Sequence, residues 1–472
     1  MLGHTLQYLA LRALPAGAGF IGMALYTRFL NPAEYGKFAQ AMAVVGLANG
    51  VVFRWLGSGL LRFYAREQSR PALLNAVART YVYLALGAIP LLGLLLAFNE
   101  KDSRWLTIAS MTALLGQAWY ELNTTLVQAE MRPLQYGRLE LVRALATLAL
   151  GFGLAASGGG AVGLLAAATV GTIIASSRWV NTDSGLQIWG SWRNSAPLGE
   201  LASYGIPLAL AFSLDFVINS SDRLIIGQLL GDTQSGFYSV AYDLSHHSVG
   251  IILIAVNMST YPRAMEAFKD GDVAHAQGQL ARNFRLLFGL GLPAATGLTL
   301  LRSNVAQTVL GAGYAESASP LIGWIAFATL AAALKAFHFD IAFHLMRATR
   351  RQVFVQATAA VVNVLLTVVL LHVLGVVGAA IATFLTFVGA GALSWSLGKR
   401  LLRIPVPGSA IAQTTVATAL MGLGLLPLVD LRGPLALSLQ VSVGAAVYVL
   451  SAAIVIPDLR IALLRRLRQG SA

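Results

Sequence analysis

The chain has 472 residues, of which 57% are apolar and only 11% are charged. Charged residues make up about a quarter of an ordinary soluble protein, so this composition excludes a soluble globular domain and indicates a membrane protein. The absence of cysteine excludes disulfides, thiolate nucleophiles, iron–sulfur clusters and zinc sites built from cysteine. The net charge of +13 is spread between apolar runs rather than gathered in one patch, which argues against a nucleic-acid partner.

Apolar runs bounded by charges, glycine or proline predict about fourteen transmembrane helices, and hence an all-α polytopic membrane protein. The first run is not followed by a small-residue cleavage site, so we expect an uncleaved signal anchor there. In chain order the predicted spans are Leu6–Leu30, Tyr35–Leu61, Thr80–Phe98, Trp105–Gln128, Leu139–Ala156, Ala161–Val180, Leu201–Leu230, Ser235–Tyr261, Phe284–Leu301, Pro320–Met346, Gln352–Val373, Val376–Leu397, Ala410–Val429 and Pro434–Ile456.

The distribution of Lys and Arg between the loops predicts the orientation. An even number of spans places both termini on one side, and loops on the cytoplasmic side carry the excess of Lys and Arg. The loops on the side of the termini, together with the C-terminal tail, hold 23 of the 33 Lys and Arg residues, whereas the opposite loops hold six. We therefore expect both termini in the cytoplasm. The four cations assigned to neither set of loops, namely Arg12, Arg54, Arg223 and Lys335, lie inside predicted spans.

Two segments 200 residues apart indicate an internal repeat. The segments FLNPAEYGKFAQA, from Phe29, and LLGDTQSGFYSVA, from Leu229, align without gaps, and each joins the first two helices of a predicted six-helix half. Leu30, Gly36 and Ala41 match Leu230, Gly236 and Ala241. This pattern predicts a six-helix bundle over residues 1–200, a second over 201–400, and two appended helices with a basic cytoplasmic tail over 401–472.

Charges at bilayer depth are costly, so they are candidates for functional residues. Lys335 lies about midway along its predicted span, where it either lines a cavity or forms a structural ion pair. Arg54 lies about 12 Å from the cytoplasmic end of its helix, so a place in a cavity and snorkelling to the surface both remain open. Arg12 lies closer to the cytoplasmic surface, where a role in topology or headgroup binding is favoured.

The seventh span carries a polar stripe. Asp215, Asn219 and Asp222 are spaced 0, 4 and 7, which places them on one side of a helix, and Arg223 flanks them. Such a stripe should face the interior of the bundle because polar groups facing lipid are very unfavourable. Two interpretations remain open, a buried network that pins helices together and a cavity wall that contacts substrate or a coupling ion.

The eighth span repeats this pattern with Asp243, His247, Gly250 and Asn257. The adjacent His246 and His247 suggest a metal, but zinc needs three or four converging ligands and this helix supplies at most two, so no metal site is expected. A carboxylate four residues from a histidine fits a proton relay better, since histidine titrates near neutral pH.

Two further spans carry polar stripes. In the fourth span the stripe consists of Gln117, Glu121, Thr124 and Gln128. In the tenth, His338 follows Lys335 by three residues, and another face is marked by Asp340, His344 and Arg347. Buried acids together with buried cations favour a hydrated, charge-bearing cavity over a purely structural bundle.

The chain is not expected to be an enzyme. Membrane glycosyl polymerases and ligases need a sizeable periplasmic loop for their catalytic residues, whereas the predicted periplasmic connections here are short, as in Asn99–Arg104 and Ser303–Ser319. The sequence contains no glycine-rich phosphate loop ending in Lys and Ser or Thr, which argues against an ATP-driven pump. No cofactor is expected.

At two stretches the sequence resembles the polysaccharide transporter family, the Wzx-type flippases of lipid-linked oligosaccharides. The first is RFLNPAEYGKFA from Arg28, followed by a helix that ends in LGSGLLRF. The second is SYGIPLALAFSLDFVINSSDRLIIGQLLGDTQSGFYSVAY from Ser203, with its Asp-Arg pair, Leu-Gly turn and later Gly-x-Tyr. With LGVVGAAIAT from Leu374, the resemblance extends over most of the chain.

The resemblance implies a fold and a function. The fold is that of the multidrug and oligosaccharide exporters (MOP superfamily), a MATE-like arrangement of two six-helix bundles with two further helices. The function is translocation of undecaprenyl-diphosphate-linked O-antigen, capsule or exopolysaccharide units across the bacterial inner membrane by ion-coupled alternating access. Substrate contacts are then expected at Arg54, Arg223, Lys335, Arg28, Arg12, Glu121 and Asn219, and coupling to protons or sodium at Asp215, Asp222, Asp243, His247 and Asp340.

The expected partners are the lipid-linked oligosaccharide, membrane lipids, a proton or sodium ion, and a polysaccharide polymerase or chain-length regulator. Two alternatives stay open. A drug or cation antiporter of the same superfamily would share the helices and the buried acids but needs fewer cavity cations. A non-transporting scaffold of a polysaccharide assembly complex needs no deep charges, so the charges argue against it.

Overall fold

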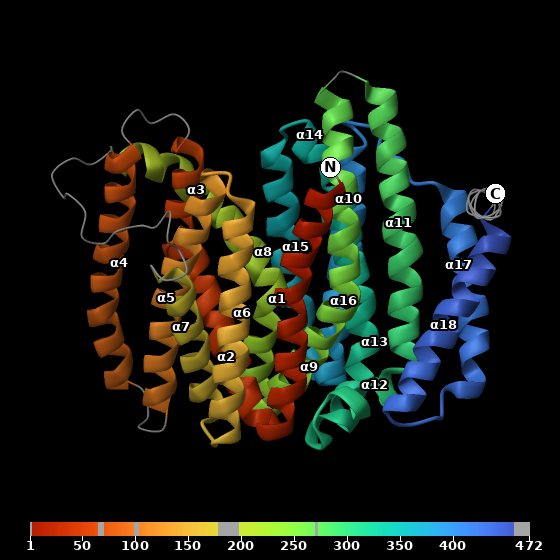
Figure 1. Cartoon of the computed structure of the whole chain (residues 1–472), viewed down its shortest axis with the longest axis horizontal. Coiled ribbons are helices and arrows are strands. Elements are labelled where there is room, and N and C mark those ends of the chain that lie inside the picture. Colours follow the sequence, from red (N-terminus) through yellow and green to blue (C-terminus); the bar gives the residue numbers. More distant parts are fainter. Residues whose placement is uncertain (1, 65–69, 99–102, 178–197, 270–271, 457–472) are drawn as a thin grey trace. The chain divides into compact units, whose positions relative to one another are not determined.

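A computed structural model describes residues 2–64, 70–98, 103–177, 198–269 and 272–456. Within these ranges the regular elements are all helices, and no strand occurs among them (Figure 1). Within the described residues, each of the fourteen predicted spans overlaps a helix or consecutive helical segments, and Arg178–Val180 of the sixth span lie outside the described residues. The all-helical prediction is therefore confirmed.

The helices divide into two compact units, Met1–Ser239 and Val240–Ala472. The predicted boundaries at residues 200 and 400 stay predictions. In the first unit α6 packs against α1 and α7, and α8 packs against α2 and α3. This unit contains α1 (Leu2–Phe29), α2 (Pro32–Val52), α3 (Arg54–Phe63), α4 (Arg70–Phe98), α5 (Arg104–Ala129), α6 (Pro133–Ala156), α7 (Gly160–Ser176), α8 (Leu198–Leu230) and the start of α9 (Asp232–Ser245).

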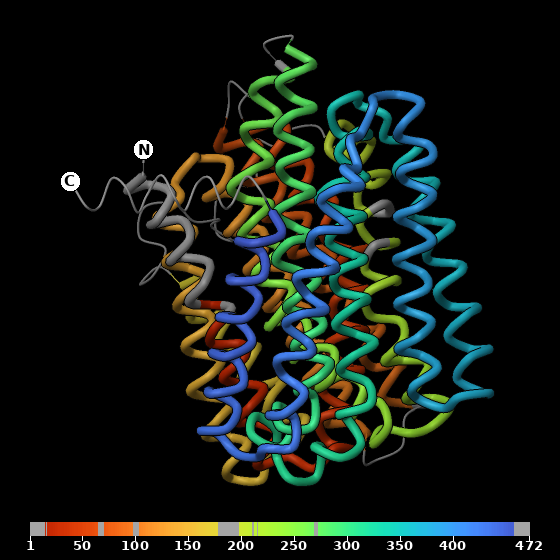
Figure 2. The backbone as a smooth tube through the Cα atoms, turned by 90° about the vertical axis from the view of Figure 1, so that its right-hand side faces the viewer, coloured from red at the N-terminus to blue at the C-terminus, as the bar shows by residue number. Residues whose placement is uncertain are grey.

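In the second unit α15 and α16 run side by side, as do α17 and α18 (Figure 2). Two π-helical segments, η2 and η3, interrupt long helices of this unit. Its elements after α9 are η2 (His246–Gly250), α10 (Ile251–Lys269), α11 (Val273–Leu300), α12 (Arg302–Val309), α13 (Ala312–Leu334), η3 (Lys335–Phe339), α14 (Ile341–Leu345), α15 (Thr349–Leu374), α16 (Val376–Gly398), α17 (Gly408–Leu425), the 3₁₀ turn η4 (Leu426–Leu428) and α18 (Pro434–Val455).

Among the described residues, eight helices are long and apolar enough to cross a membrane, and there are up to eleven if each sharply bent helix pair is one span. The bent pairs include α2 with α3, which meet at 45°, and α11 with α12, which meet at 76°. Helix α7 is apolar but shorter. A multi-span membrane protein is thus confirmed, while the count of fourteen stays a prediction.

Small residues bring helices of the first unit close together. A Cβ atom added to Gly46 of α2 would lie 2.1 Å from the ring of Phe216, so α8 contacts the backbone of α2 directly. Inside a bilayer apolar side chains gain little by leaving lipid for protein, and close van der Waals packing at small residues drives helix association instead. The buried core around Leu56, Leu60 and Leu126 then fills the space between α3 and its neighbours.

The two repeat segments of the sequence touch each other through equivalent residues. A Cβ atom added to Gly36 would lie 1.9 Å from the carbonyl oxygen of Asp232, and one added to Gly236 would lie 1.9 Å from the carbonyl oxygen of Pro32. Residues 32 and 36 correspond to residues 232 and 236 in the 200-residue alignment. The first turns of α2 and α9 therefore form a reciprocal contact that only glycine permits.

Candidate functional site

A cavity of about 380 Å³ lies in the first unit where α3 follows the bend after α2, and we name it the Arg54 cavity. Its walls come from α2, α3, α5, α6 and α8. The α5 wall holds Gln117, Glu121, Thr124 and Gln128, which are the four residues of the polar stripe predicted for the fourth span. A volume of this size lies within the range of small-molecule sites, roughly 300–1,000 Å³.

The bend between α2 and α3 places Arg54 in this cavity. The α-helical hydrogen bonding of α2 ends at Phe53, and the indole Nε1 of Trp55 donates to the carbonyl oxygen of Val52 at 2.9 Å, which satisfies an acceptor at the bend. The exposed Arg54 guanidinium stacks on Phe212 of α8, 4.5 Å from the ring centroid. Among the described residues Arg54 forms no ion pair, so its charge is available to an anionic ligand.

Glu121 lies in the same wall and is held by two amides. Asn49 Nδ2 donates to one carboxylate oxygen at 2.8 Å, and Gln117 Nε2 donates to the other at 2.7 Å. Asn49 comes from the last turn of α2, so this contact ties α2 to α5 across 72 residues of sequence. The structure thus brings Arg54 and Glu121, two of the predicted substrate residues, to one cavity.

An ion pair on α6 also lines the Arg54 cavity, and sequence reasoning missed it. Arg143 Nη2 bonds to Glu140 Oε2 at 2.9 Å, and the Arg143 guanidinium lies over the ring of Tyr120 at 5.0 Å. Arg143 counts as a loop cation in the positive-inside analysis, whereas α6 begins at Pro133 and places it almost three turns inside the helix. The signal was present, because Tyr136, Glu140 and Arg143 have the spacing 0, 4 and 7.

The predicted residues on α8 do not line the Arg54 cavity. Two of them instead form hydrogen bonds with residues of α9. Asp222 is buried, with 1% exposure, and accepts a hydrogen bond of 2.7 Å from the Tyr238 hydroxyl. The backbone oxygen of Arg223 accepts one of 2.9 Å from the Ser235 hydroxyl, and the side chains of Asn219 and Arg223 are half-buried. These bonds join α8 to α9.

Lys335 and Asp340 form a buried ion pair in the second unit. Their side chains are about 4% exposed, and the Lys335 Nζ lies 2.7 Å from Asp340 Oδ2. Lys335 also donates to Gln356 Oε1 at 2.8 Å, and the Ser394 hydroxyl donates to Asp340 Oδ1 at 2.6 Å. The placement of Asp340 on a different face from Lys335 is wrong, because the π-helical hydrogen bond from Asp340 N to Lys335 O brings the two side chains together.

The remaining predicted residues are placed separately. Asp243 and His247 are half-buried, and His247 lies in the π-helical segment η2, where its ring centroid is 5.9 Å from that of His246. Arg28 is exposed at the end of α1. The side chains of Arg12 and Asp215 lie outside the described part of the chain. Among the described residues, no three His, Asp or Glu side chains are grouped to hold a metal ion.

The fold matches those of known transporters. The chain has a TM-score of 0.78 with the lipid II flippase MurJ in an inward closed conformation, at 12% identity, covering 96% of this chain and 99% of that one. With an inward-facing multidrug resistance MATE family transporter of the MOP superfamily, the TM-score is 0.57 at 14% identity, covering 83% of this chain and 93% of that one. The predicted MATE-like fold is confirmed.

Sequence comparison points to the same group. The probable low-salt glycan biosynthesis flippase Agl15 of Haloferax volcanii is 21% identical over 445 residues, which cover 92% of this chain and 91% of that protein. These relatives are named as flippases and transporters rather than as enzymes, in agreement with the sequence prediction. The polysaccharide biosynthesis protein family matches residues 25–319, more than half of the sequence and both of its main motif stretches. The chain therefore belongs to the polysaccharide biosynthesis protein family and has the fold of the MOP superfamily.

Proposed function

We propose that this protein is a flippase for a lipid-linked oligosaccharide. In this proposal it carries an undecaprenyl-diphosphate-linked unit of O-antigen, capsule or exopolysaccharide from the cytoplasmic to the periplasmic leaflet of a bacterial inner membrane. The observation that carries the proposal is the Arg54 cavity, a polar space inside a membrane bundle with an arginine that has no ion-pair partner among the described residues. The names of Agl15 and MurJ, both flippases, support it.

The chemistry of the cavity suits the polar part of such a substrate. A diphosphate needs a fixed cation in a low-dielectric medium, where an unpaired charge would be very unfavourable. Arg54 supplies that cation, and its planar guanidinium can donate two parallel hydrogen bonds to phosphate oxygens. Amides and hydroxyls such as those of Asn49, Gln117 and Thr124 can exchange hydrogen bonds with sugar hydroxyls in place of water.

Ion coupling belongs to the same proposal. A proton or sodium ion would drive the alternation between inward-open and outward-open states through Asp215, Asp222, Asp243, His247 and Asp340. The buried carboxylate of Asp222, bonded to Tyr238, supports this assignment, because a change in its protonation would alter the link between α8 and α9. A polysaccharide polymerase or chain-length regulator is the proposed protein partner.

The test measures translocation of a fluorescent polyprenyl-diphosphate oligosaccharide in proteoliposomes, with and without a proton or sodium gradient. Arg54→Gln should slow translocation about tenfold or more, since a charge-assisted hydrogen bond contributes ~1.5–3 kcal/mol. Arg54→Lys should keep a larger part of the rate than Arg54→Gln, because it keeps the charge but not the planar donors.

The matched control is Arg62→Gln. Arg62 lies on the same helix α3 and stacks on Tyr204 of α8 at 4.2 Å, yet it is not part of the cavity lining. The Arg62→Gln variant should translocate the oligosaccharide lipid at the same rate as the unaltered protein. Equal rates for Arg54→Gln and the unaltered protein would contradict the proposal. Gradient-driven uptake of a lipophilic cation with no translocation of the glycan lipid would identify an antiporter instead.

A further inference from the structure

A second cavity of about 730 Å³ lies in the first unit, and we name it the Glu34 cavity. Its lining comes from α2 between Glu34 and Ala48, the starts of α5 and α7, the ends of α4 and α8, and Asp232 at the start of α9. The Arg54 cavity is lined by later residues of α2 and α5 and by residues of α3. The two cavities therefore lie toward opposite ends of the same helices, and the Glu34 cavity is at the end predicted to face the periplasm.

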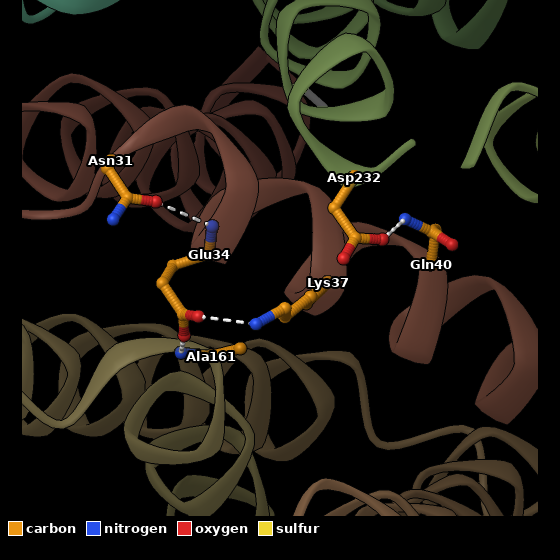
Figure 3. A network of polar contacts seen from close by, with 6 residues as sticks. All are labelled: Asn31, Glu34, Lys37, Gln40, Ala161 and Asp232. Atoms are coloured by element: carbon orange, nitrogen blue, oxygen red, sulfur yellow. Dashed lines mark hydrogen bonds and ion pairs between the residues drawn. The ribbon is translucent and has the colours of Figure 1, made fainter. Parts of the chain in front are cut away.

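One part of this cavity is charged and closely organised (Figure 3). Asn31 caps α2 by accepting a hydrogen bond of 2.9 Å from the backbone N–H of Glu34. The Glu34 carboxylate does not turn back to its own helix start but accepts from the backbone N–H of Ala161, at 2.9 Å, in the first turn of α7. Its other oxygen is 2.9 Å from Lys37 Nζ, so Glu34 and Lys37 neutralise each other.

Asp232 leaves this charged part with a net negative charge. Gln40 Nε2 donates to Asp232 Oδ1 at 2.8 Å, and among the described residues Asp232 forms no ion pair. Among the residues that the structure describes, Lys37 is the only cation in the lining, and it forms an ion pair with Glu34. An anionic headgroup alone is therefore disfavoured here, whereas an ammonium group fits beside the Asp232 carboxylate.

The other part of the cavity is apolar and adjoins the surface of α4. Leu91 and Leu95 line it from α4 and are 49% and 41% exposed, and Leu106 and Met111 face it from α5. In the apolar stretch of α4, only 17% of the residues are buried in the protein. Lipid therefore covers most of this helix in a membrane. A hydrocarbon chain can thus enter between α4 and α5 from the bilayer while its polar end stays near Lys37.

We propose that the Glu34 cavity binds a membrane phospholipid with a primary ammonium headgroup. Its ammonium is held by Asp232 and the side-chain oxygen of Gln40, its phosphate by Lys37, and one acyl chain lies along Leu91, Leu95 and Leu106. The site is separate from the proposed substrate cavity and does not depend on it, because its net charge disfavours a diphosphate. The lipid would bind in the periplasmic leaflet and stabilise the first unit.

The test measures thermal unfolding of the purified full-length chain in detergent against added lipids. Phosphatidylethanolamine should raise Tm, while phosphatidylglycerol, which has no ammonium, and phosphatidylcholine, which has no N–H donor, should raise it less. Glycerophosphoethanolamine carries the same headgroup without chains and should give no shift, which separates a lipid from a free amine. Asp232→Asn should weaken the apparent affinity for phosphatidylethanolamine about tenfold.

Two further variants keep the outcome decisive. Glu316→Gln removes one exposed acid from the start of α13, outside the cavity lining, and should respond to phosphatidylethanolamine as the unaltered protein does. Leu95→Trp fills the apolar part without touching the charges and should abolish the shift. Equal shifts with all three phospholipids, or an unchanged response in both Asp232→Asn and Leu95→Trp, would overturn the proposal.

Discussion

At the residue scale, the ion pair of Lys335 and Asp340 shows how a local change from α-helix to π-helix determines which acid a buried lysine contacts. In an α-helix residues five apart point about 140° away from each other, so their side chains cannot meet. The hydrogen bond of 2.9 Å from Asp340 N to Lys335 O widens the helix by one residue at η3 and turns the two side chains to one side. The deep lysine predicted for this span therefore carries an acid partner from its own helix.

Removing one member of this pair should destabilise the protein strongly. Lys335→Met leaves the Asp340 carboxylate buried without a cation, which costs about 3–5 kcal/mol. Lys335→Met combined with Asp340→Asn should recover most of that loss, because no charge is then buried. Thermal unfolding in detergent measures both, and Lys399→Met, an exposed lysine over Trp395, should stay close to the unaltered protein.

The same variants separate two roles for Lys335. If the double variant is stable and translocates substrate, the lysine is structural. If the double variant is stable but does not translocate substrate, Lys335 contributes to substrate binding. A single variant Lys335→Met as stable as the unaltered protein would contradict the burial argument.

Arg143 shows what sequence reasoning lacks at this scale. Its charge and its spacing from Glu140 are visible in the sequence, but a cation near a predicted helix start is indistinguishable from a topology signal. The contact with Tyr120 on α5 is what turns Arg143 toward the Arg54 cavity. No periodicity along α6 contains that information.

At the scale of elements, the reciprocal contact of α2 and α9 depends on the two repeat glycines. Gly36 and Gly236 each admit a carbonyl oxygen of the other helix to a distance that a side chain would forbid. The sequence shows the two glycines as a match in an alignment, which indicates a common origin of the segments. That the matched glycines touch each other is a property of the fold.

Gly36→Ala should lower the stability of the first unit by about 1–3 kcal/mol, since overpacking forces the backbones of α2 and α9 apart. The matched control is Gly93→Ala on α4, where an added Cβ would meet nothing within 4 Å. There the higher helix propensity of alanine should leave Tm unchanged or raise it. Equal Tm values for Gly36→Ala and Gly93→Ala would contradict the close contact.

Hydropathy predicts the elements well and their internal breaks poorly. The span Tyr35–Leu61 corresponds to α2 and α3, and the apolar pattern gives no sign of the 45° bend at Phe53 that positions Arg54. The span Pro320–Met346 likewise contains η3. A π-helical segment is one recognised cause of a break within a helix, and the apolar character of the segment does not reveal it.

At the scale of the whole molecule, the orientation in the membrane is open to a direct test, because the chain contains no cysteine. Met131, 84% exposed, and Ser157 lie just beyond the two ends of α6, a helix of 24 residues that is about 36 Å long. A membrane-impermeant maleimide should label Ser157→Cys in intact cells and Met131→Cys only in inside-out vesicles. Labelling of both from the same side would contradict the predicted topology.

The sequence by itself determines that this is a multi-span helical membrane protein of a polysaccharide biosynthesis family. It does so because hydropathy and motif stretches are local properties, readable along one helix. Only the tertiary structure decides which polar groups meet. Asn49 and Glu121 are 72 residues apart, Glu34 and Ala161 are 127 apart, and Gln40 and Asp232 are 192 apart. Each bond depends on how neighbouring helices bend and approach, and this geometry is set by the packing of small residues between helices.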